Sequence, residues 1–355
     1  MPKRVGAISR RRLLGYLGAV GAATVASVGA PARFAPLTRS AAAATGPAVT
    51  SGKKIILKVA SNQAGDENSV NWGWRRFGEA VAQKLPGAID YQFYPAGQLG
   101  GDKDFLEGLR LGTLQMAVIG QISNVAPRMG LLDVAYLFSS YEQAEKYLNS
   151  PAYAELESAL PGKGLQPFPK GWWWSSWRQL TNSKRAVRTP DDLKGLKIRV
   201  PAIQGNLKAL QVFGANATPM DFTEVYTALQ TGVLDGQENP PEVILSNKLY
   251  EVQKYLSLTQ HMFWAPPPVA SKKWWDGLPK DIQTGLEAAM NEIAPLQRKF
   301  SVDHDAEYIK QLGQKGMQVN EVNKQPFVAL AKEKLWPQFE KDFGKELQAV
   351  EAMTK

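Results

Sequence analysis

Two arginines and an asparagine between residues 178 and 239 are the side chains best suited to hold a small ligand. Arg178 opens the sequence Arg-Gln-Leu-Thr-Asn, Arg199 lies within Lys-Ile-Arg-Val-Pro, and Asn239 belongs to Asp-Gly-Gln-Glu-Asn-Pro. A guanidinium binds a carboxylate well because its fork of N–H donors matches the two oxygens. The asparagine amide adds one more donor. Taken singly, each arginine is also compatible with a surface position or an intramolecular salt bridge. Because no nucleophile, base or metal cluster lies nearby, the segment predicts a site that holds a carboxylate without reacting with it.

Aromatic side chains near this segment are candidates for contacting the rest of the ligand. Trp174 ends a run of three tryptophans, Trp264 precedes Ala-Pro-Pro-Pro, and Phe222 follows a predicted helix cap at Asp221. Such rings stack on sugars and aromatic ligands, but they also fill hydrophobic cores. We therefore expect Trp174, Trp264 and Phe222 to contact the ligand, with packing in a core or at a seam between lobes as the alternative.

The sequence does not fit the common catalytic templates. Its two histidines, His261 and His304, are too few for a triad or a metal site, and the chain has no cysteine. No glycine-rich loop has the spacing of a phosphate or dinucleotide site. The acidic pairs at 66–67 and 191–192 lie where helix starts and turns favour acids. We expect no metal, no cofactor and no enzyme activity, although a carboxylate pair distant in sequence, as in glycosidases, stays open.

The first part of the chain alternates between strand and helix patterns. In order, the expected elements are a strand, a helix, a strand, a helix and a strand at 54–60, 68–85, 89–94, 102–112 and 114–119. This order implies a parallel α/β sheet, whose ligands bind beyond the carboxyl ends of the strands. Asn68 follows the first strand and Gln121 follows the third. We therefore expect both side chains at the mouth of the site.

The second part of the chain is predicted to repeat this organisation. Alternation along a strand at 172–180 places Arg178 on the same face as Trp172 and Trp174, opposite Trp173 and Trp177. In a strand at 196–200, Arg199 points away from the inward apolar side chains. Helices are expected at 222–233, 279–313 and 327–339, the second being long and bent at Pro295.

The first 44 residues have the pattern of an export signal. Arg10, Arg11 and Arg12 precede two leucines, an apolar run follows, and small residues end the segment. This predicts a twin-arginine signal and hence the twin-arginine export machinery as a partner, with an ordinary secretory signal as the alternative. Seven of the 42 Lys and Arg residues lie there, without any acid. Residues 45–355 thus carry 35 basic and 33 acidic side chains, a net charge of +2, which does not predict nucleic-acid binding.

At these residues the chain resembles a known family, the periplasmic substrate-binding subunits of tripartite ATP-independent periplasmic (TRAP) transporters of the C4-dicarboxylate-binding, DctP-like type. The resemblance covers nearly all of the chain after the signal. Its matching segments are 94–101, 178–182, 192–201, 214–220, 224–232 and 235–240. So many segments in one order are more specific than any single motif.

The resemblance implies a two-lobed α/β binding protein. Each lobe is expected to be a mixed, mostly parallel sheet flanked by helices, with a long helix spanning both lobes. Lobe I is expected to comprise 53–175 and about 265–304, and lobe II about 176–264 and 305–355. In this family Arg199 corresponds to the main carboxylate anchor, Arg178 to the second arginine, Asn239 to an assisting amide and Phe222 to a ring against the ligand. The resemblance further implies a soluble periplasmic protein that captures a small organic acid and delivers it to TRAP membrane permease subunits for uptake driven by an ion gradient.

Two departures from the family pattern bear on the substrate. The loop 62–71 lacks the histidines that many relatives carry there, and the segment before Arg178 is rich in tryptophan. Both are expected around the end of the ligand away from its carboxylate. A sugar acid, or an aromatic or branched acid, would use the tryptophans better than a bare C4-dicarboxylate. Two other hypotheses stay open, namely a secreted hydrolase or lyase acting on an acidic sugar, and a sensor-type binding protein.

Overall fold

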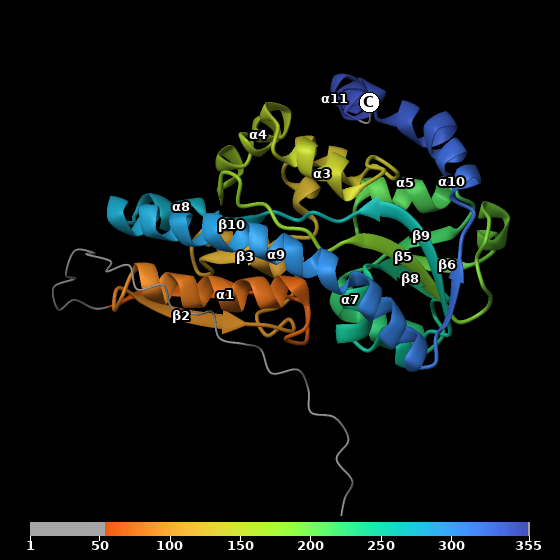
Figure 1. Ribbon diagram of the computed structural model, residues 1–355, viewed down its shortest axis with the longest axis horizontal. Helices are drawn as coiled ribbons and strands as arrows, with labels where there is room; N and C mark the ends of the chain where they lie inside the picture. The colour runs from red at the N-terminus through yellow and green to blue at the C-terminus, as the bar shows by residue number, and fades with distance from the viewer. Residues whose placement is uncertain (1–53, 354–355) are drawn as a thin grey trace, which may run out of the picture. The chain divides into compact units, whose positions relative to one another are not determined.

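The computed structural model describes residues 54–353, and the predicted export signal lies outside them. The first of its two sheets has five strands in the order β2-β1-β3-β10-β4 (Figure 1). Strand β1 pairs in parallel with β2 and β3, whereas β10 runs antiparallel to β3 and β4. The strand bounds are β1 Ile55–Ala60, β2 Ile89–Tyr94, β3 Met116–Val118, β4 Leu165–Pro167 and β10 Pro268–Ser271.

Helix α1, Ser69–Lys84, covers this sheet because its apolar side chains recur on one face. The Asn68 side chain caps the helix by accepting hydrogen bonds from the backbone N–H groups of Val70 and Asn71. Val70, Trp74 and Phe77 are buried in one core with side chains from β1 and from the long helix α9. The other helices and 3-10 turns of this part are α2 Asp102–Leu111, η1 Ile122–Asn124, η2 Pro127–Asp133, α3 Tyr141–Leu148, α4 Pro151–Glu157, η3 Pro161–Lys163 and α8 Lys272–Asp276.

The second sheet has six strands in the order β11-β9-β5-β8-β6-β7. Strand β5 runs antiparallel to β8 and β9, whereas the pairs β6–β7, β6–β8 and β9–β11 are parallel. Both sheets are therefore mixed. The strand bounds are β5 Trp177–Asn182, β6 Lys197–Val200, β7 Asn216–Pro219, β8 Gly236–Asn239, β9 Tyr255–Phe263 and β11 Gln318–Glu321. The flanking segments are η4 Pro190–Leu193, α5 Gln204–Val212, η5 Phe222–Glu224, α6 Val225–Gln230, α7 Pro241–Ser246 and η6 Leu249–Glu251.

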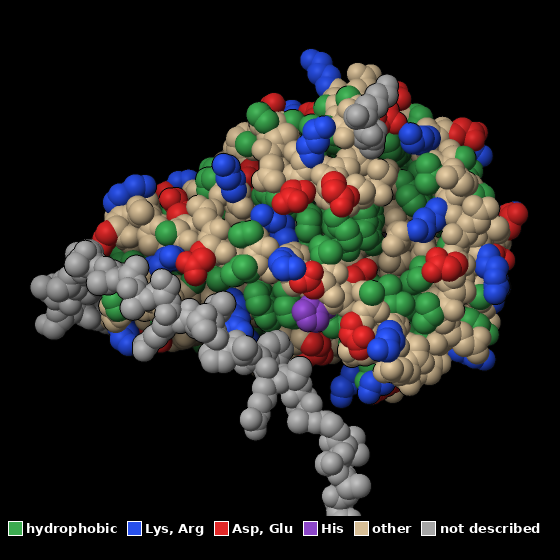
Figure 2. All heavy atoms as spheres, in the orientation of Figure 1, with side chains coloured by type: hydrophobic (Ala, Val, Ile, Leu, Met, Phe, Trp, Pro, Cys, Tyr) green, Lys and Arg blue, Asp and Glu red, His purple; other side chains and the backbone are tan. Residues whose placement is uncertain are grey.

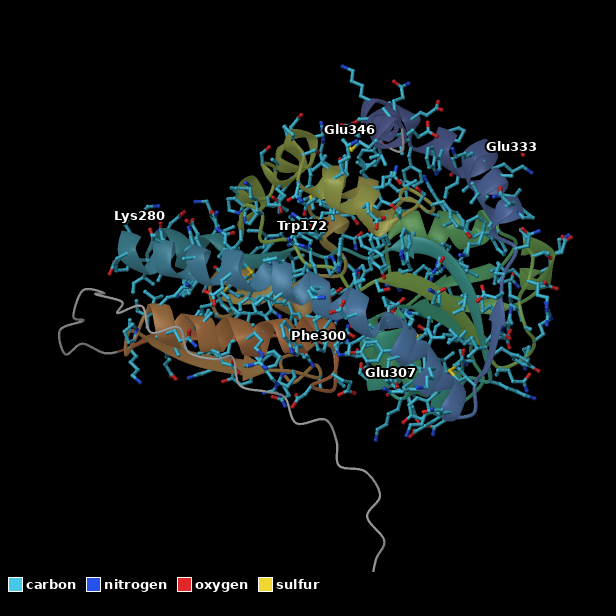
Figure 3. The ribbon with its side chains drawn as sticks, viewed as in Figure 1. Trp172, Lys280, Phe300, Glu307, Glu333 and Glu346 are labelled. Atoms are coloured by element: carbon cyan, nitrogen blue, oxygen red, sulfur yellow. The ribbon has the colours of Figure 1, made fainter. Side chains whose placement is uncertain are left out.

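The long helix predicted near the C-terminus is α9, Lys280–Gln314, which has 35 residues and contains Pro295. Lys280, Phe300 and Glu307 mark its course (Figure 3). Its first half buries Leu286 in the core of the first sheet, and its last turns bury Leu312 in the core beside α6 and α7. The predicted fold class, two mixed sheets flanked by helices with a long helix serving both, is confirmed.

The strands of each sheet lie within the residue ranges predicted for one lobe. The largest hydrophobic core nevertheless joins both ranges, since it contains Leu131 as well as Val200 and Leu335. The division of the chain into lobes at residues 175/176 and 264/265 therefore stays a prediction.

Two predicted elements differ from the structure. The strand expected at 172–180 begins only at Trp177, because Ser176 has a φ of +71° and turns the chain out of the extended conformation. Consequently Trp177 shares a core with Trp172 and Trp174, contrary to the predicted alternation. The single helix expected at 327–339 is broken around Pro337. It consists of α10 Lys324–Leu330, a π-helical turn Ala331–Leu335, a 3-10 turn Trp336–Gln338 and α11 Glu340–Ala352.

Candidate ligand-binding site

Six of the eight predicted ligand-binding residues line one cavity. Arg178, Arg199 and Asn239 lie in strands of the second sheet. The other three, Gln121, Phe222 and Trp264, lie in the segments that follow β3, β7 and β9. The structure thus brings the two arginines together with two amides and two rings. A substrate-binding role for each of these residues stays a prediction.

Strand β6 places Arg199 in the cavity wall, where only 2% of the residue is exposed. Its Nε and Nη2 atoms both donate to the carbonyl oxygen of Met220, at 3.0 and 2.7 Å. These bonds fix the plane of the guanidinium and use two of its five N–H donors. The Phe222 ring centroid lies 5.8 Å from its Cζ. Burial and the charge of Arg178 lower the pKa of Arg199 to about 10, so the side chain is still charged at neutral pH.

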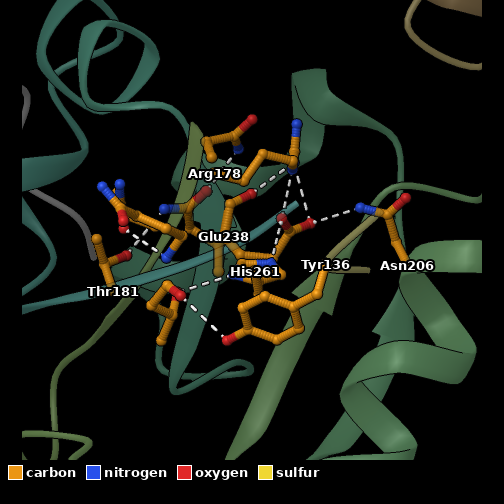
Figure 4. Close-up of polar contacts among 11 residues, drawn as sticks. Tyr136, Arg178, Thr181, Asn206, Glu238 and His261 are labelled. Carbon is orange, nitrogen blue, oxygen red and sulfur yellow. Dashed lines mark hydrogen bonds and ion pairs between the residues drawn. The ribbon is translucent and has the colours of Figure 1, made fainter. Parts of the chain in front are cut away.

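Strand β5 places Arg178 beside Glu238 of strand β8. The Arg178 Nε donates to Glu238 Oε2, and Nη2 donates to Oε1 at 3.0 Å and to the Glu238 carbonyl oxygen at 2.6 Å (Figure 4). The guanidinium also lies 5.7 Å from the ring centroid of Trp264. Arg178 is thus a neutralised cation, whereas within residues 54–353 no carboxylate forms a salt bridge with Arg199.

Glu238, which sequence reasoning missed, does not line the cavity itself but bonds two residues that do, Arg178 and Asn206. Its carboxylate accepts a hydrogen bond from Asn206 Nδ2 at 3.1 Å and lies 3.1 Å from His261 Nε2 (Figure 4). The other ring nitrogen of His261, Nδ1, is hydrogen-bonded to the Thr259 hydroxyl. Burial alone would raise the pKa of Glu238, but Arg178 and His261 outweigh that effect and lower it to about 2. The segment Asp-Gly-Gln-Glu-Asn-Pro contains this residue, but only the pairing of β5 with β8 reveals its partner.

Asp102, the first residue of α2, also lines the cavity and also went unpredicted. Asn62 Nδ2 donates to Asp102 Oδ1 at 3.1 Å, and Gln63 Nε2 in turn donates to Asn62 Oδ1 at 2.7 Å. Burial and the charge of Asp221 raise the pKa of Asp102 to about 7. Backbone hydrogen bonds from Gly120 and Gln121 and the charge of Arg199 lower the pKa and so oppose this shift. The cavity therefore combines two guanidinium groups and several amides with the carboxyl groups of Asp102 and Asp133, whose pKa values both lie near 7.

Trp174 and Asn68 do not belong to this cavity lining. Trp174 packs against Trp172 and Phe263 in the largest core, and its Nε1 donates to the Arg298 carbonyl oxygen at 2.8 Å. Asn68 uses its side-chain oxygen to cap α1. The structure therefore favours the packing alternative for Trp174.

Among residues 54–353, no group of three or more His, Asp or Glu side chains is placed to hold a metal ion. In the same part of the chain, none of the helices combines the length and the apolar character that a membrane span requires. Acidic and basic side chains are interspersed over the face shown in Figure 2.

Comparison with known proteins connects this geometry to a family. Residues 60–342 match the family described as bacterial extracellular solute-binding protein, family 7 (DctP). The chain is 37% identical to the 2,3-diketo-L-gulonate-binding periplasmic protein YiaO of Escherichia coli over 69% of its own length and 75% of that protein. It is 34% identical to the C4-dicarboxylate-binding periplasmic protein DctP of Rhodobacter capsulatus, over 67% of the chain and 71% of that protein.

Solved structures agree with this match. A TRAP periplasmic solute-binding protein from Polaromonas, bound to D-erythronate, superposes with a TM-score of 0.79 at 32% identity and covers 84% of this chain and 98% of its own. The sugar acid binding protein DctPAm from Advenella mimigardefordensis, in complex with galactonate, gives a TM-score of 0.80 at 30% identity, with coverage of 85% and 99%.

Proposed function

Because this chain belongs to the DctP family of bacterial extracellular solute-binding proteins, we propose that it captures a small organic acid in the cavity lined by Arg178 and Arg199. The observation that carries the proposal is the contrast between the two arginines. Arg178 is neutralised by Glu238, whereas Arg199 is buried in the cavity wall without an ion-pair partner among the described residues. A buried unpaired guanidinium is costly unless an anion pairs with it, and a carboxylate fits its donors.

The relatives support a carboxylate as the ligand and a permease as the partner. Proteins of this family with similar structures bind D-erythronate and galactonate, both of which are hydroxylated carboxylates. The protein would act outside the cytoplasm and deliver its ligand to TRAP permease subunits, without turnover of the ligand. The arginines of the segment 10–12 support export through the twin-arginine route.

Calorimetric titration with a panel of small carboxylates tests the proposal. Arg199→Ala should weaken binding of any ligand acid by about 2–5 kcal/mol, as expected for removing one partner of a buried charge pair. Arg199→Lys should also bind poorly, because a point charge does not replace the two-pronged guanidinium. The control is Arg188→Ala, since Arg188 is exposed and lies outside the cavity lining. Equal affinity in Arg199→Ala and the wild type would contradict the proposal.

One observation favours a second candidate, a hydrolase or lyase acting on an acidic sugar. Burial raises the pKa values of both Asp102 and Asp133 to about 7, and both side chains line the cavity. Carboxyl groups that titrate near neutrality are suited to general acid–base catalysis. Prolonged incubation of a bound acid with the protein, followed by NMR of the acid, decides between the two. An unchanged spectrum rejects catalysis.

A further inference from the structure

Two residues of the cavity lining that carry buried acceptor oxygens come from backbone segments in close contact. Asp133 ends the 3-10 segment η2, Asn206 lies in the first turn of α5, and both line the cavity. Gly205 brings them together, since a Cβ added there would clash with the Asp133 carbonyl oxygen and would lie 2.6 Å from the Asp133 Cβ. Only glycine permits this close approach, so the two side chains emerge from adjacent stretches of backbone.

The chemistry of Glu238 fixes the orientation of the Asn206 amide. Asn206 Nδ2 donates to the Glu238 carboxylate, which is ionised because its pKa is about 2. The amide nitrogen must therefore face Glu238, and the oxygen Oδ1 points elsewhere. Asn206 is 2% exposed, and no described residue donates a hydrogen bond to its Oδ1. This oxygen is an acceptor that neither bulk solvent nor the described part of the protein satisfies.

Asp133 presents a second acceptor of this kind. Its Oδ2 is buried and receives no hydrogen bond from residues 54–353. Burial raises the pKa of Asp133, while the Ser123 hydroxyl and the charge of Arg178 lower it, and the result is about 7. A donor at Oδ2 would stabilise the carboxylate form. Asp102 differs, because Asn62 and two backbone N–H groups already bond its carboxyl.

We propose that Asp133 and Asn206 form a hydroxyl-binding subsite, which makes hydroxylated acids the preferred ligands of this protein. The inference rests on the proposed function, in which Arg199 holds the carboxylate of the ligand. Buried acceptors without a donor are costly, and the hydroxyl groups of a polyhydroxylated acid supply donors. The second carboxylate of a plain dicarboxylate supplies only acceptors at neutral pH and adds a negative charge next to Asp133. The subsite would thus select against succinate and its homologues.

Matched pairs of acids test this inference on the purified full-length chain. The probes are D-erythronate against butyrate and D-galactonate against hexanoate, which differ in their hydroxyl groups at equal carbon number, together with succinate. Calorimetry would measure each affinity in the wild type, Asp133→Ala, Asn206→Ala and Arg199→Ala. Asp133→Asn is the conservative variant, since asparagine has the same size as aspartate and keeps one acceptor oxygen. Circular dichroism and thermal melts would verify that each variant is folded.

The inference predicts that the wild type binds a hydroxylated acid at least tenfold more tightly than its deoxygenated partner and than succinate. Asp133→Ala and Asn206→Ala should each reduce that preference at least tenfold, and Asp133→Asn should restore part of it. If binding depends on Arg199 but Asp133→Ala and Asn206→Ala leave the preference unchanged, or the wild type prefers succinate, the subsite is rejected while the proposed function stands. If no probe binds in an Arg199-dependent manner, both are overturned.

Discussion

Arg178, which lines the cavity, forms an ion pair with Glu238 behind it, and 5% and 0% of their side-chain surfaces are exposed. This pair separates the roles of the two cavity arginines. Glu238 orients Arg178 and neutralises it, and the same carboxylate orients Asn206 and His261. Under the proposed function, the charge that a ligand would meet is mainly that of Arg199, and Glu238 would position the groups around it.

Replacing Glu238 by glutamine should destabilise the protein by about 3 kcal/mol, because it leaves Arg178 charged, buried and without its counterion. Chemical denaturation at neutral pH would measure the change in the free energy of unfolding. The matched control is Glu333→Gln, since Glu333 is exposed on the C-terminal helical segment (Figure 3). A difference between the two variants below about 1 kcal/mol would show that the ion pair contributes little net stability.

The stability of the protein should depend on pH partly through Glu242 of α7. Its carboxyl group is buried and accepts hydrogen bonds from the Ser69 backbone N–H at 3.0 Å, the Ser69 hydroxyl at 2.8 Å and the Ser175 hydroxyl. Burial raises the pKa of Glu242 to about 8, with Asp305 raising it further and Ser69 opposing the shift. The raised pKa means that folding favours the protonated form.

The sign of the effect follows from this shift. The stabilisation linked to the Glu242 proton is complete below the ordinary glutamate pKa of about 4.5 and is lost as the pH rises toward 8. Glu242→Gln keeps a neutral side chain, so its unfolding free energy should fall less than that of the wild type between pH 5 and pH 8. Between pH 5 and pH 8 the unfolding free energy of the wild type should fall by on the order of 3 kcal/mol more than that of Glu242→Gln. Parallel stability curves for the two proteins would reject this role.

The close approach at Gly205 should make this position intolerant of alanine. An added Cβ would clash with Asp133, so Gly205→Ala should destabilise the protein by about 1–3 kcal/mol despite the better helix propensity of alanine. Gly313→Ala in α9 is the control, because its Cβ would lie 3.7 Å from the nearest atom, a Val319 side-chain carbon. The control should be neutral or more stable by up to about 1 kcal/mol. Thermal melts of both variants would measure the contrast, and equal melting temperatures would contradict it.

Local patterns in the sequence predicted most elements near the site. The strand at 89–94 coincides with β2, and the apolar stripe from Val70 to Val81 lies in α1 with its residues buried. Both depend on side-chain period and on turn residues, which act over a few positions. The positions of Arg178, Arg199 and Asn239 in one cavity were also expected, because their segments resemble those of one family.

The features that were missed depend on contacts between distant segments. Glu238 becomes the partner of Arg178 only through the antiparallel register of β5 and β8. The segments of Asp133 and Asn206 come together only through the close packing of Gly205 against Asp133, and neither residue lies in a motif of its own. The strand expected at 172–180 was too long because Ser176 has a left-handed backbone conformation. Glycine or asparagine usually marks such a position in a sequence, and neither is present at residue 176.

The placement of Trp174 leads to a last prediction, which separates packing from ligand binding. Its ring lies in the core beside Trp172 and Phe263, and its Nε1 donates to Arg298. Trp174→Phe should therefore lower the free energy of unfolding by about 1–3 kcal/mol through the lost hydrogen bond and lost volume. Trp174→Phe should change the affinity for a bound acid by less than threefold. Trp264 lines the cavity, so Trp264→Phe should weaken binding by more than threefold. Calorimetry on both variants at a temperature where each is folded would decide. A tenfold loss of affinity in Trp174→Phe would mean that this tryptophan acts on the ligand after all.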